Sequence, residues 1–572
     1  MSNCLSNCGV THKKRRNTAL LTSGLCLGFA FSVPVYAQTT PDSGVIQQQL
    51  EKRKAPTLPD QSPSLAPLPP EMKSSGGLTF TVSKFRFVGN NELDDNLLTI
   101  AVEDYLGKPI DFAGLQAAAA AVGETYREAG WLVKAYLPHQ EIADGVVTIE
   151  IVEAVFGKVY LDGEPKRYSE ERIKSVVEKD QTKGKIFNAR ALDRRLLLLD
   201  DFPGVSVSGN LKPGANQAET DLVLKIADEP LVNGTLGLDN TGSRTTGKER
   251  GTMNVFVNSP AGIGDLITSD VILSRGTKYG RLGYSLPIGD DGLRVGANSS
   301  YLSYNVITPE FASLDLNGHS KSFGANLEYP IIRSGKRNLY VSGGFERKAY
   351  RNSSLSSVNS EYGIDNLYVN VTGNLFDRFG GGGANMASLT LTHGDLDLGV
   401  VDSNENSELD GRFTKLRYSL SRQQALVEDL SVFTSLSGQF AGKNLDSAEK
   451  FYLGGANGVR AYPANEGGGS EGHMINAELR YRWNKDLVLT GFYDWGRVIV
   501  NEDNSITSPA APNNFNLKGA GVSASWVGPG NANLVATYAR RIGSNPNPTS
   551  SGYDQDGSKK VHRFWLALKV PF

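Results

Sequence analysis

Cysteine is almost absent from this 572-residue chain and occurs only at Cys4, Cys8 and Cys26. If this segment is removed as an export signal, the remaining chain has no disulfide, thiol nucleophile or cysteine-ligated metal. Histidine is also sparse, and those beyond His12 are scattered at His139, His319, His393, His473 and His562. Because no paired-His, HExxH or nucleophile-elbow motif occurs, we expect a protein that is not an enzyme and has no catalytic residues.

Long hydrophobic runs and an excess of one charge are missing as well. Hydrophobic residues make up 39% of the chain, and the mean hydropathy is −0.29. The 59 basic and 61 acidic residues balance, so the chain is not a polycation and lacks the charge footprint of a nucleic-acid-binding protein. Glycine clusters at 380–383 and 467–469 lack the Lys-Ser/Thr of a phosphate loop, so we expect no cofactor or metal. The abundant residues are Gly (63), Tyr (22) and Phe (23), which is typical of β-rich chains.

Residues 1–37 have the three parts of a secretory signal peptide. Four basic residues at 13–16 precede an apolar stretch at 18–33, and Val35-Tyr36-Ala37 supplies the small residues of a cleavage site. The apolar stretch is too short for an ordinary membrane-spanning helix. We expect cleavage after Ala37 and export of the chain, with an uncleaved anchor as the alternative.

Residues 38–55 contain an amphipathic stretch, and residues 56–77 a linker. The stretch at 44–54 places Val45, Ile46 and Leu50 on one side, opposite Gln47, Gln48 and Lys52. It has the length of about three helical turns. The linker is rich in proline and ends in Ser74-Ser75-Gly76-Gly77, so it is semi-rigid with a reach on the order of 60 Å. It is long enough to deliver the helix into another part of the protein.

Two similar α+β units are predicted at 78–154 and 155–228. Each has the order strand, helix, helix, strand, strand. The predicted ranges are 80–88, 94–105, 111–129, 134–138 and 145–153 in the first unit, and 156–161, 169–178, 188–199, 205–211 and 221–227 in the second. Val147, Ile149 and Ile151 alternate with polar residues, as half-buried strands do. A repeated small module in an exported chain favours a binding adaptor over an active site.

From 229 to 572 the helical period disappears and segments of about ten residues alternate apolar and polar. Ile475, Leu479 and Tyr481 alternate with Asn476, Glu478 and Arg480. Brief connections at 287–292, 483–486 and 527–531 alternate with longer polar ones at 305–318, 395–411 and 544–557. This asymmetry is typical of outer-membrane barrels and not of soluble sandwiches. We predict about sixteen strands, an aqueous lumen, and a last strand ending at Phe572 that serves as a barrel-recognition signal.

The longest external connection, at 442–472, is unusually apolar for a loop in water. It contains Gly458-Val459-Arg460-Ala461-Tyr462-Pro463, which indicates that it folds back against another surface. Alternation places Phe492 and Asp494 toward the lumen and Tyr493 and Trp495 toward lipid. A guanidinium can meet a carboxylate through two hydrogen bonds, so Arg460 and Asp494 form a candidate latch, the alternative being an exposed loop arginine.

These features resemble the TpsB transporters of two-partner secretion, the haemolysin-activator and filamentous-haemagglutinin-transporter family. The family's loop tip, Val-Arg-Gly-Tyr, is matched by Val459, Arg460 and Tyr462, with Ala461 in place of glycine. The partner motif Phe-x-Asp-x-Gly is matched by Phe492, Asp494 and Gly496. The similarity covers nearly all of the chain after residue 37. It implies a mainly β fold: a sixteen-stranded transmembrane barrel preceded by two POTRA domains and a plug helix.

The resemblance also implies the function and the partners. The POTRA pair would capture an unfolded exoprotein in the periplasm, and the barrel would secrete it through the outer membrane without nucleotide. That exoprotein would be an adhesin, a cytolysin or a haem-binding protein. Barrel-assembly machinery and outer-membrane lipid are the expected partners for insertion.

Two other membrane functions remain open. A barrel-assembly insertase shares the fold and the loop motif but usually carries more POTRA modules. A diffusion porin would not need adaptor domains, so porin activity is expected only as a leak.

Overall fold

The computed structural model describes residues 41–51, 79–216, 218–401, 409–505 and 512–572. The predicted signal peptide and proline-rich linker lie outside these residues. The predicted helix at 44–54 corresponds to α1 (Ser43–Glu51), and its last three positions lie outside the described residues as well. No helix in the described ranges is long and apolar enough to cross a membrane.

The first α+β unit is built on a three-stranded sheet in the order β2-β5-β4, with β2 parallel to β5. Its elements are β1 (Phe80–Thr81), β2 (Lys84–Val88), α2 (Asp95–Ala101), η1 (Glu103–Tyr105), β3 (Pro109–Ile110), α3 (Phe112–Ala129), β4 (Val133–Tyr136) and β5 (Val146–Glu153). The Asp111 side chain caps α3 by accepting from Gly114 N, and Gly130, at a φ of 100°, ends it.

Two predictions in this unit are wrong in detail. The single strand expected at 80–88 is two strands, because β1 pairs with β3 whereas β2 pairs with β5. The helix expected at 94–105 breaks after Ala101 and resumes as a 3₁₀ turn. Both differences arise from pairing and packing that local periodicity does not encode.

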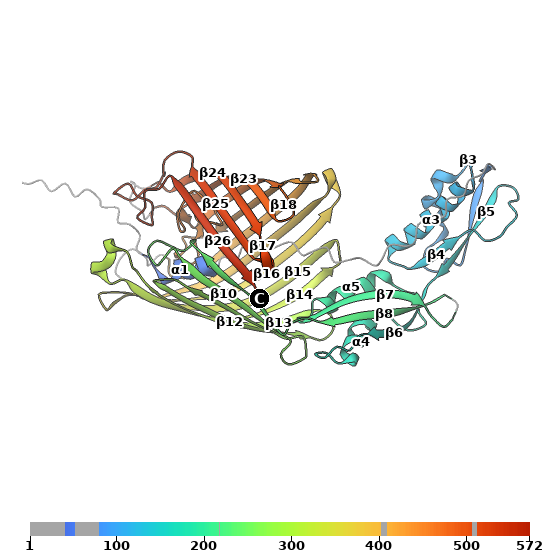
Figure 1. Ribbon diagram of the computed structural model, residues 1–572, viewed down its shortest axis with the longest axis horizontal. Helices are drawn as coiled ribbons and strands as arrows, with labels where there is room; N and C mark the ends of the chain where they lie inside the picture. The colour runs from blue at the N-terminus through green and yellow to red at the C-terminus, as the bar shows by residue number, and fades with distance from the viewer. Residues whose placement is uncertain (1–40, 52–78, 217, 402–408, 506–511) are drawn as a thin grey trace, which may run out of the picture. The chain divides into compact units, whose positions relative to one another are not determined.

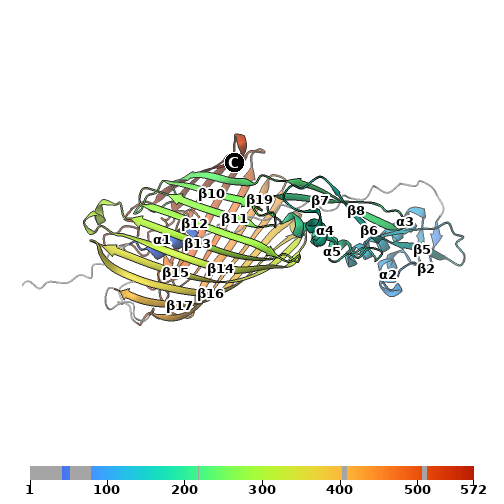
Figure 2. The same cartoon turned by 90° about the horizontal axis from the view of Figure 1, so that it is seen from below.

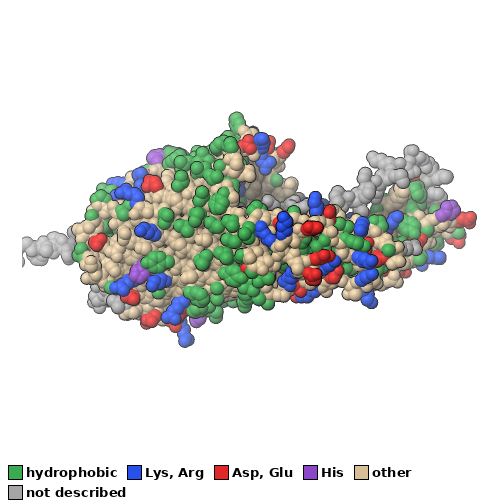
Figure 3. Space-filling view, turned by 60° about the horizontal axis from the view of Figure 1, so that its bottom comes forward, with side chains coloured by type: hydrophobic (Ala, Val, Ile, Leu, Met, Phe, Trp, Pro, Cys, Tyr) green, Lys and Arg blue, Asp and Glu red, His purple; other side chains and the backbone are tan. Residues whose placement is uncertain are grey.

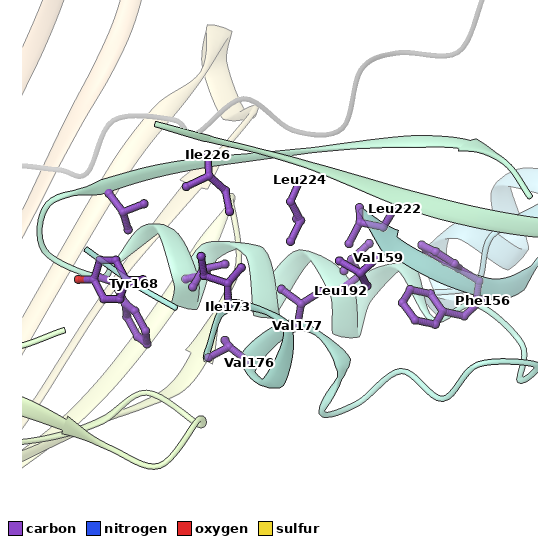
Figure 4. Packing of buried hydrophobic residues seen from close by; sticks show 14 residues of the cluster. Phe156, Val159, Tyr168, Ile173, Val176, Val177, Leu192, Leu222, Leu224 and Ile226 are labelled. Atoms are coloured by element: carbon purple, nitrogen blue, oxygen red, sulfur yellow. The ribbon is translucent and has the colours of Figure 1, made fainter. Parts of the chain in front are cut away.

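The second unit repeats the arrangement with a sheet in the order β6-β8-β7. Its elements are β6 (Val155–Asp162), α4 (Glu170–Glu178), α5 (Ala189–Asp200), β7 (Val205–Pro213) and β8 (Glu219–Asp228). Figure 4 shows how side chains from both helices meet those of the sheet. Ile173, Leu192 and Leu224 are fully buried in that layer. Each unit therefore has a hydrophobic core of its own.

Sixteen antiparallel strands between residues 232 and 571 form a closed barrel (Figures 1 and 2). The strands are β9 (Val232–Asp239), β10 (Arg250–Asn258), β11 (Leu266–Leu273), β12 (Thr277–Ile288), β13 (Leu293–Asn305), β14 (Asn317–Arg333), β15 (Arg337–Ser354), β16 (Ser357–Asp377), β17 (Gly383–Val401), β18 (Gly411–Val427), β19 (Leu430–Ala441), β22 (Glu471–Arg482), β23 (Leu487–Ile499), β24 (Asn514–Val527), β25 (Asn533–Arg541) and β26 (His562–Pro571). The last strand closes on the first, with Ala567 opposite Asp239. The predicted fold class is confirmed.

The outward face of the strands is apolar, as lipid requires. Leu327, Leu367 and Leu479 are 54%, 61% and 49% exposed. The predicted loop at 395–411 is wrong in its first half, because β17 continues to Val401. Strands β14 to β17 have 17 to 21 residues and extend past the apolar band on the side of the long loops. Three 3₁₀ turns lie in connections between strands: η2 (Pro309–Leu314) between β13 and β14, η3 (Phe379–Gly381) between β16 and β17, and η4 (Pro529–Asn531) between β24 and β25.

Candidate functional site

The connection between β19 and β22, here called the pore loop (442–470), folds back against the inner wall of the barrel. It contains a short hairpin of β20 (Phe451–Tyr452) and β21 (Gly468–Gly469). Leu453, Val459 and Tyr462 are almost completely buried and belong to one cluster with wall residues of β23, β24 and β25. The apolar character of this loop is therefore explained by burial inside the barrel.

The tip of the pore loop is held by Arg460. Its Nε and NH2 donate to the two carboxylate oxygens of Asp494 at 2.9 and 2.7 Å, and its backbone N donates to Asp494 Oδ2 at 3.0 Å. The remaining guanidinium nitrogen donates to Glu478 Oε1 at 2.8 Å. Arg460 Cζ also lies 3.5 Å from the ring centroid of Phe492. The arginine therefore meets two carboxylates and one aromatic face on the wall.

Two contacts at the tip escaped the sequence reasoning. Trp565 on β26 donates from Nε1 to the Arg460 carbonyl at 2.8 Å. Glu478 is the other, although alternation along β22 already placed it on the inward face. The two-carboxylate arrangement could thus have been found from the strand pattern, whereas the tryptophan contact depends on how the barrel closes.

A second attachment lies in the ascending limb of the pore loop, at Glu449. Its Oε1 accepts from Lys348 Nζ and Asn366 Nδ2, each at 3.1 Å. Its other oxygen forms an ion pair with Lys415, and both side chains are 4% exposed. Arg417 NH2 donates to the Glu449 carbonyl at 3.3 Å. No signal in the sequence identifies Glu449 as an attachment point, because an acidic residue in an external loop is usually exposed to solvent.

Helix α1 occupies the lumen beside the pore loop (Figure 1). Ile46 is buried against Tyr279, Leu302 and Tyr304, and Leu50 packs at the edge of this cluster. Glu51 Oε1 accepts from the Tyr279 hydroxyl at 2.9 Å. These contacts hold one side of the helix on strands β12 and β13.

Part of the polar side of α1 is buried too, which the sequence did not predict. Gln47 is 1% exposed and donates to Ser300 Oγ at 3.3 Å. Gln48 Nε2 donates to the carbonyl of Lys450 in the pore loop at 2.5 Å. Val45 is 9% exposed. The helix therefore contacts the lumen wall through Gln47 and the pore loop through Gln48, while its polar side also borders the remaining luminal space.

The space that remains is a luminal cavity of about 1760 Å³. It is lined by α1, the pore loop and the inner wall, and Glu51, Glu449 and Arg460 all border it. Two elements therefore fill much of the pore, and both are fastened to the wall by side-chain contacts.

Comparison with known proteins decides the family. Residues 218–525 match the family described as haemolysin secretion/activation protein ShlB/FhaC/HecB, and residues 80–154 match the ShlB-type POTRA domain. The chain belongs to this family of TpsB transporters. It is therefore an outer-membrane transporter of two-partner secretion, with POTRA domains that are periplasmic in this family.

Similar proteins include transporters from several bacteria. The chain is 27% identical to the heme/hemopexin transporter protein HuxB of Haemophilus influenzae (strain 86-028NP), over 98% of this chain and 100% of that one. It is 23% identical to the outer membrane transporter CdiB of Escherichia coli O6:K15:H31, over 80% and 79% of the two chains.

Solved structures share the fold. CdiB from Escherichia coli matches with a TM-score of 0.68 at 19% identity, over 92% of this chain and 95% of that chain. BamA from Haemophilus ducreyi lacking POTRA domains 1–3 matches with a TM-score of 0.50 at 13% identity, over 86% and 100%. The architecture is thus common to both kinds of protein.

The transporter departs from the family pattern at Ala461, where the loop tip usually has glycine. Ala461 does not adopt a positive φ, so the backbone there does not require glycine. The alanine is fully buried and faces Gly519 of β24. A Cβ built on Gly519 would lie 2.6 Å from the Ala461 Cβ, so the wall leaves room for the tip only because position 519 is glycine.

We therefore expect Gly519→Val to displace the pore-loop tip of the transporter. Overpacking of this kind costs about 1–3 kcal/mol, and it should weaken the Arg460–Asp494 contact. The measurement is protease cleavage of the pore loop in folded protein, with secretion as a second readout. Ala461→Gly in the same chain should restore protection, because it removes the colliding methyl group. If the double variant behaves like Gly519→Val alone, the steric account is wrong.

The base of the pore-loop hairpin carries an unusual carboxyl group at Glu466. It is 1% exposed and accepts from Asn545 Nδ2 at 2.7 Å and from Gln555 N at 2.8 Å, both in the connection between β25 and β26. Burial raises the pKa of Glu466 to about 7. Glu466 thereby joins the pore loop to the last external loop of the transporter.

This pKa predicts a pH-dependent contact between the two loops. Because the folded pKa is raised, the contribution of Glu466 to stability is complete below its usual pKa and is lost as pH rises through about 7. We expect the free energy of local opening in 451–469, obtained from amide hydrogen exchange after correction for the intrinsic pH dependence of exchange, to be higher at pH 5 than at pH 8, by about 3 kcal/mol or less. Glu466→Gln should remove most of the pH dependence. Equal slopes in the two proteins would contradict the assignment.

Proposed function

We propose that the transporter recognises an unfolded exoprotein in the periplasm through its POTRA domains and passes it to the cell surface through the barrel lumen. The observation that carries the proposal is that non-covalent side-chain contacts hold both luminal elements on the barrel wall. Arg460 and Glu449 hold the pore loop, and Glu51 holds α1. An α-helix with its side chains is about 10–12 Å across. Departure of α1 would therefore open a path wide enough for an extended chain.

The passage needs no nucleotide in this proposal. The sequence contains no phosphate-binding loop, and we infer that folding of the exoprotein outside the cell supplies the direction. Folding of one domain is favourable by roughly 5–15 kcal/mol, which is enough to prevent return of each folded segment. An unfolded substrate is also what a pore partly filled by its own loop would accept.

Among the three substrate classes, the similarity to HuxB favours a haem-binding exoprotein. That relative is named a heme/hemopexin transporter, and the match extends over 98% of this chain and 100% of the relative. The CdiB match covers only 80% of this chain. We further propose that barrel-assembly machinery inserts the transporter into the lipid of the outer membrane by way of β26.

Deletion of the gene tests the function against the insertase alternative. The proposal expects one large haem-binding protein to disappear from the surface and the medium, while other outer-membrane barrels keep their levels. Wild-type transporter supplied in trans should restore it. General loss of outer-membrane barrels would instead support an insertase and overturn the transporter.

The plug role of α1 is tested by conductance. Deletion of residues 43–51 should raise the single-channel conductance of the barrel several-fold, because a cylinder about 10–12 Å across leaves the lumen. Glu502→Gln, at an exposed external position, is the control and should leave the conductance unchanged. Folded barrel is verified by heat-modifiable migration. Unchanged conductance after the deletion would rule out α1 as a plug.

A further inference from the structure

The outward face of the barrel carries a cluster of cations at the external edge of its apolar band. On β14 the outward-facing residues from Phe323 to Ile331 are apolar or aromatic, and the next outward residue on the external side is Lys321. On β15 the same change occurs between Phe345 and Arg347. The external side is identified by the long connection that precedes β14 and the tight turn that follows it.

The strand pairing brings three of these cations together. Lys321 is directly opposite Ala349, so Arg347 and Arg351 are its two diagonal neighbours on the same face. Diagonal neighbours in an antiparallel pair lie about 7–8 Å apart. The face is outward because the intervening Lys348 points into the lumen and binds Glu449. The cluster is therefore fixed by backbone register and does not depend on chosen rotamers.

The cations of this cluster are incompletely neutralised. Arg347 Nε lies 3.7 Å from Asp365 Oδ1, and Arg351 NH1 lies 3.8 Å from Glu361 Oε2. Both distances are beyond hydrogen-bond range. Lys321 forms no ion pair with the residues that the structure describes. The Arg347 side chain is 73% exposed. Three cations with two loosely placed carboxylates leave unused N–H donors at the membrane edge.

The depth of the cluster matches the headgroup layer. Phe323 to Ile331 spans about 26 Å of strand, which a tilt of about 40° reduces to about 20 Å across the membrane. Lys321 and Arg347 lie directly beyond this band. Figure 3 shows Lys and Arg side chains gathered at this end of the barrel next to the hydrophobic side chains. Tyr301 of β13 is directly opposite Lys321 and is 50% exposed. Its ring stacks with that of His319, with the ring centroids 6.3 Å apart.

We propose that Lys321, Arg347 and Arg351 bind the phosphate groups of a phosphorylated glycolipid in the outer leaflet. Arginine and lysine recognise phosphate by charge-assisted hydrogen bonds. A tyrosine at the membrane–water interface suits such a lipid, because its ring can contact the acyl chains while its hydroxyl faces the polar headgroup. The acyl chains would lie on the apolar band beneath, along Phe323 and Phe345. The site lies on the opposite face of the wall from the pore loop and does not depend on the transport proposal.

The test measures binding of purified diphosphoryl lipid A to the full mature chain in detergent, by native mass spectrometry. Lys321→Gln/Arg347→Gln/Arg351→Gln should bind about 100-fold more weakly than wild type, because each basic residue at a lipid surface contributes about a fivefold gain in affinity and the three factors multiply. The matched control is Lys336→Gln/Arg337→Gln/Lys485→Gln, which removes three cations from the opposite end of the barrel. Heat-modifiable migration verifies that each variant is folded.

Two further probes separate the possible ligands. Dephosphorylated lipid A should bind wild type as weakly as the diphosphoryl form binds the triple variant. Inorganic phosphate should not compete at equal concentration, because it lacks the apolar part. The proposal is overturned if the control variant loses as much affinity as the cluster variant, if dephosphorylation has no effect, or if inorganic phosphate displaces the lipid.

Discussion

Arg460→Ala should reduce secretion by more than tenfold while the barrel remains folded in the outer membrane. The substitution leaves Asp494, which is fully buried, without its cation, whereas Glu478 keeps Arg480 at 2.7 Å. Removing one partner of a buried ion pair costs about 3–5 kcal/mol, and here the loss falls on the pore-loop tip. The Phe492 face loses its cation as well. Secretion of the exoprotein is measured against the amount of heat-modifiable barrel in the membrane.

Two variants separate the latch from a general effect of charge. Arg460→Lys keeps the charge but cannot form the two-pronged contact with Asp494, so it should secrete at an intermediate level. Arg482→Ala removes an exposed arginine from β22 and should secrete normally. Normal export by Arg460→Ala would show that the latch has no role in transport.

Glu449→Gln should release the ascending limb of the pore loop and increase the leak through the barrel. It leaves the buried ammonium of Lys415 without a counterion, at a cost of about 3–5 kcal/mol. Lys348 keeps Glu346 at 3.0 Å, so the damage centres on Lys415. Single-channel conductance and protease cleavage near 445–450 are the measurements, and both should rise.

The rescue and the control for this anchor follow from the same contacts. Lys415→Met in the Glu449→Gln chain removes the unpaired charge and should return conductance toward the wild-type value. Glu502→Gln makes the same chemical change at an exposed external position and should have no effect. If Glu449→Gln leaves conductance and cleavage unchanged, Glu449 does not anchor the loop.

Much of the fold was predictable because the two faces of a membrane strand have different environments, which require different residue types. Residues that face lipid must be apolar and those that face water need not be, so Ile475, Leu479 and Tyr481 revealed β22 directly. The apolar alternation ends where the strands leave the lipid, so the sequence predicts a loop at 395–401 where the structure has the end of β17. In the first α+β unit, the division of 80–88 between two sheets depends on β3, which lies far along the chain.

The candidate site was predictable only in part. Arg460 and Asp494 could be paired because charge complementarity and alternation both pointed to the lumen. Glu449, Trp565 and Gly519 could not be found in this way, since their importance depends on which wall strand faces each part of the pore loop. That correspondence is set by closure of the barrel, a long-range property without a local signal. The need for glycine at position 519 in particular becomes apparent only from its close contact with Ala461.

The most direct test of the account is to fasten α1 inside the pore. The chain after residue 37 has no cysteine, so Gln47→Cys and Ser300→Cys introduce a single thiol pair between the helix and the wall, where Nε2 and Oγ are 3.3 Å apart. Cells are treated with a short methanethiosulfonate crosslinker, and appearance of the exoprotein at the surface is followed. We predict that crosslinking stops secretion, that reductant restores it, and that neither single variant responds. Continued secretion by the fully crosslinked protein would contradict passage through a lumen that α1 must leave.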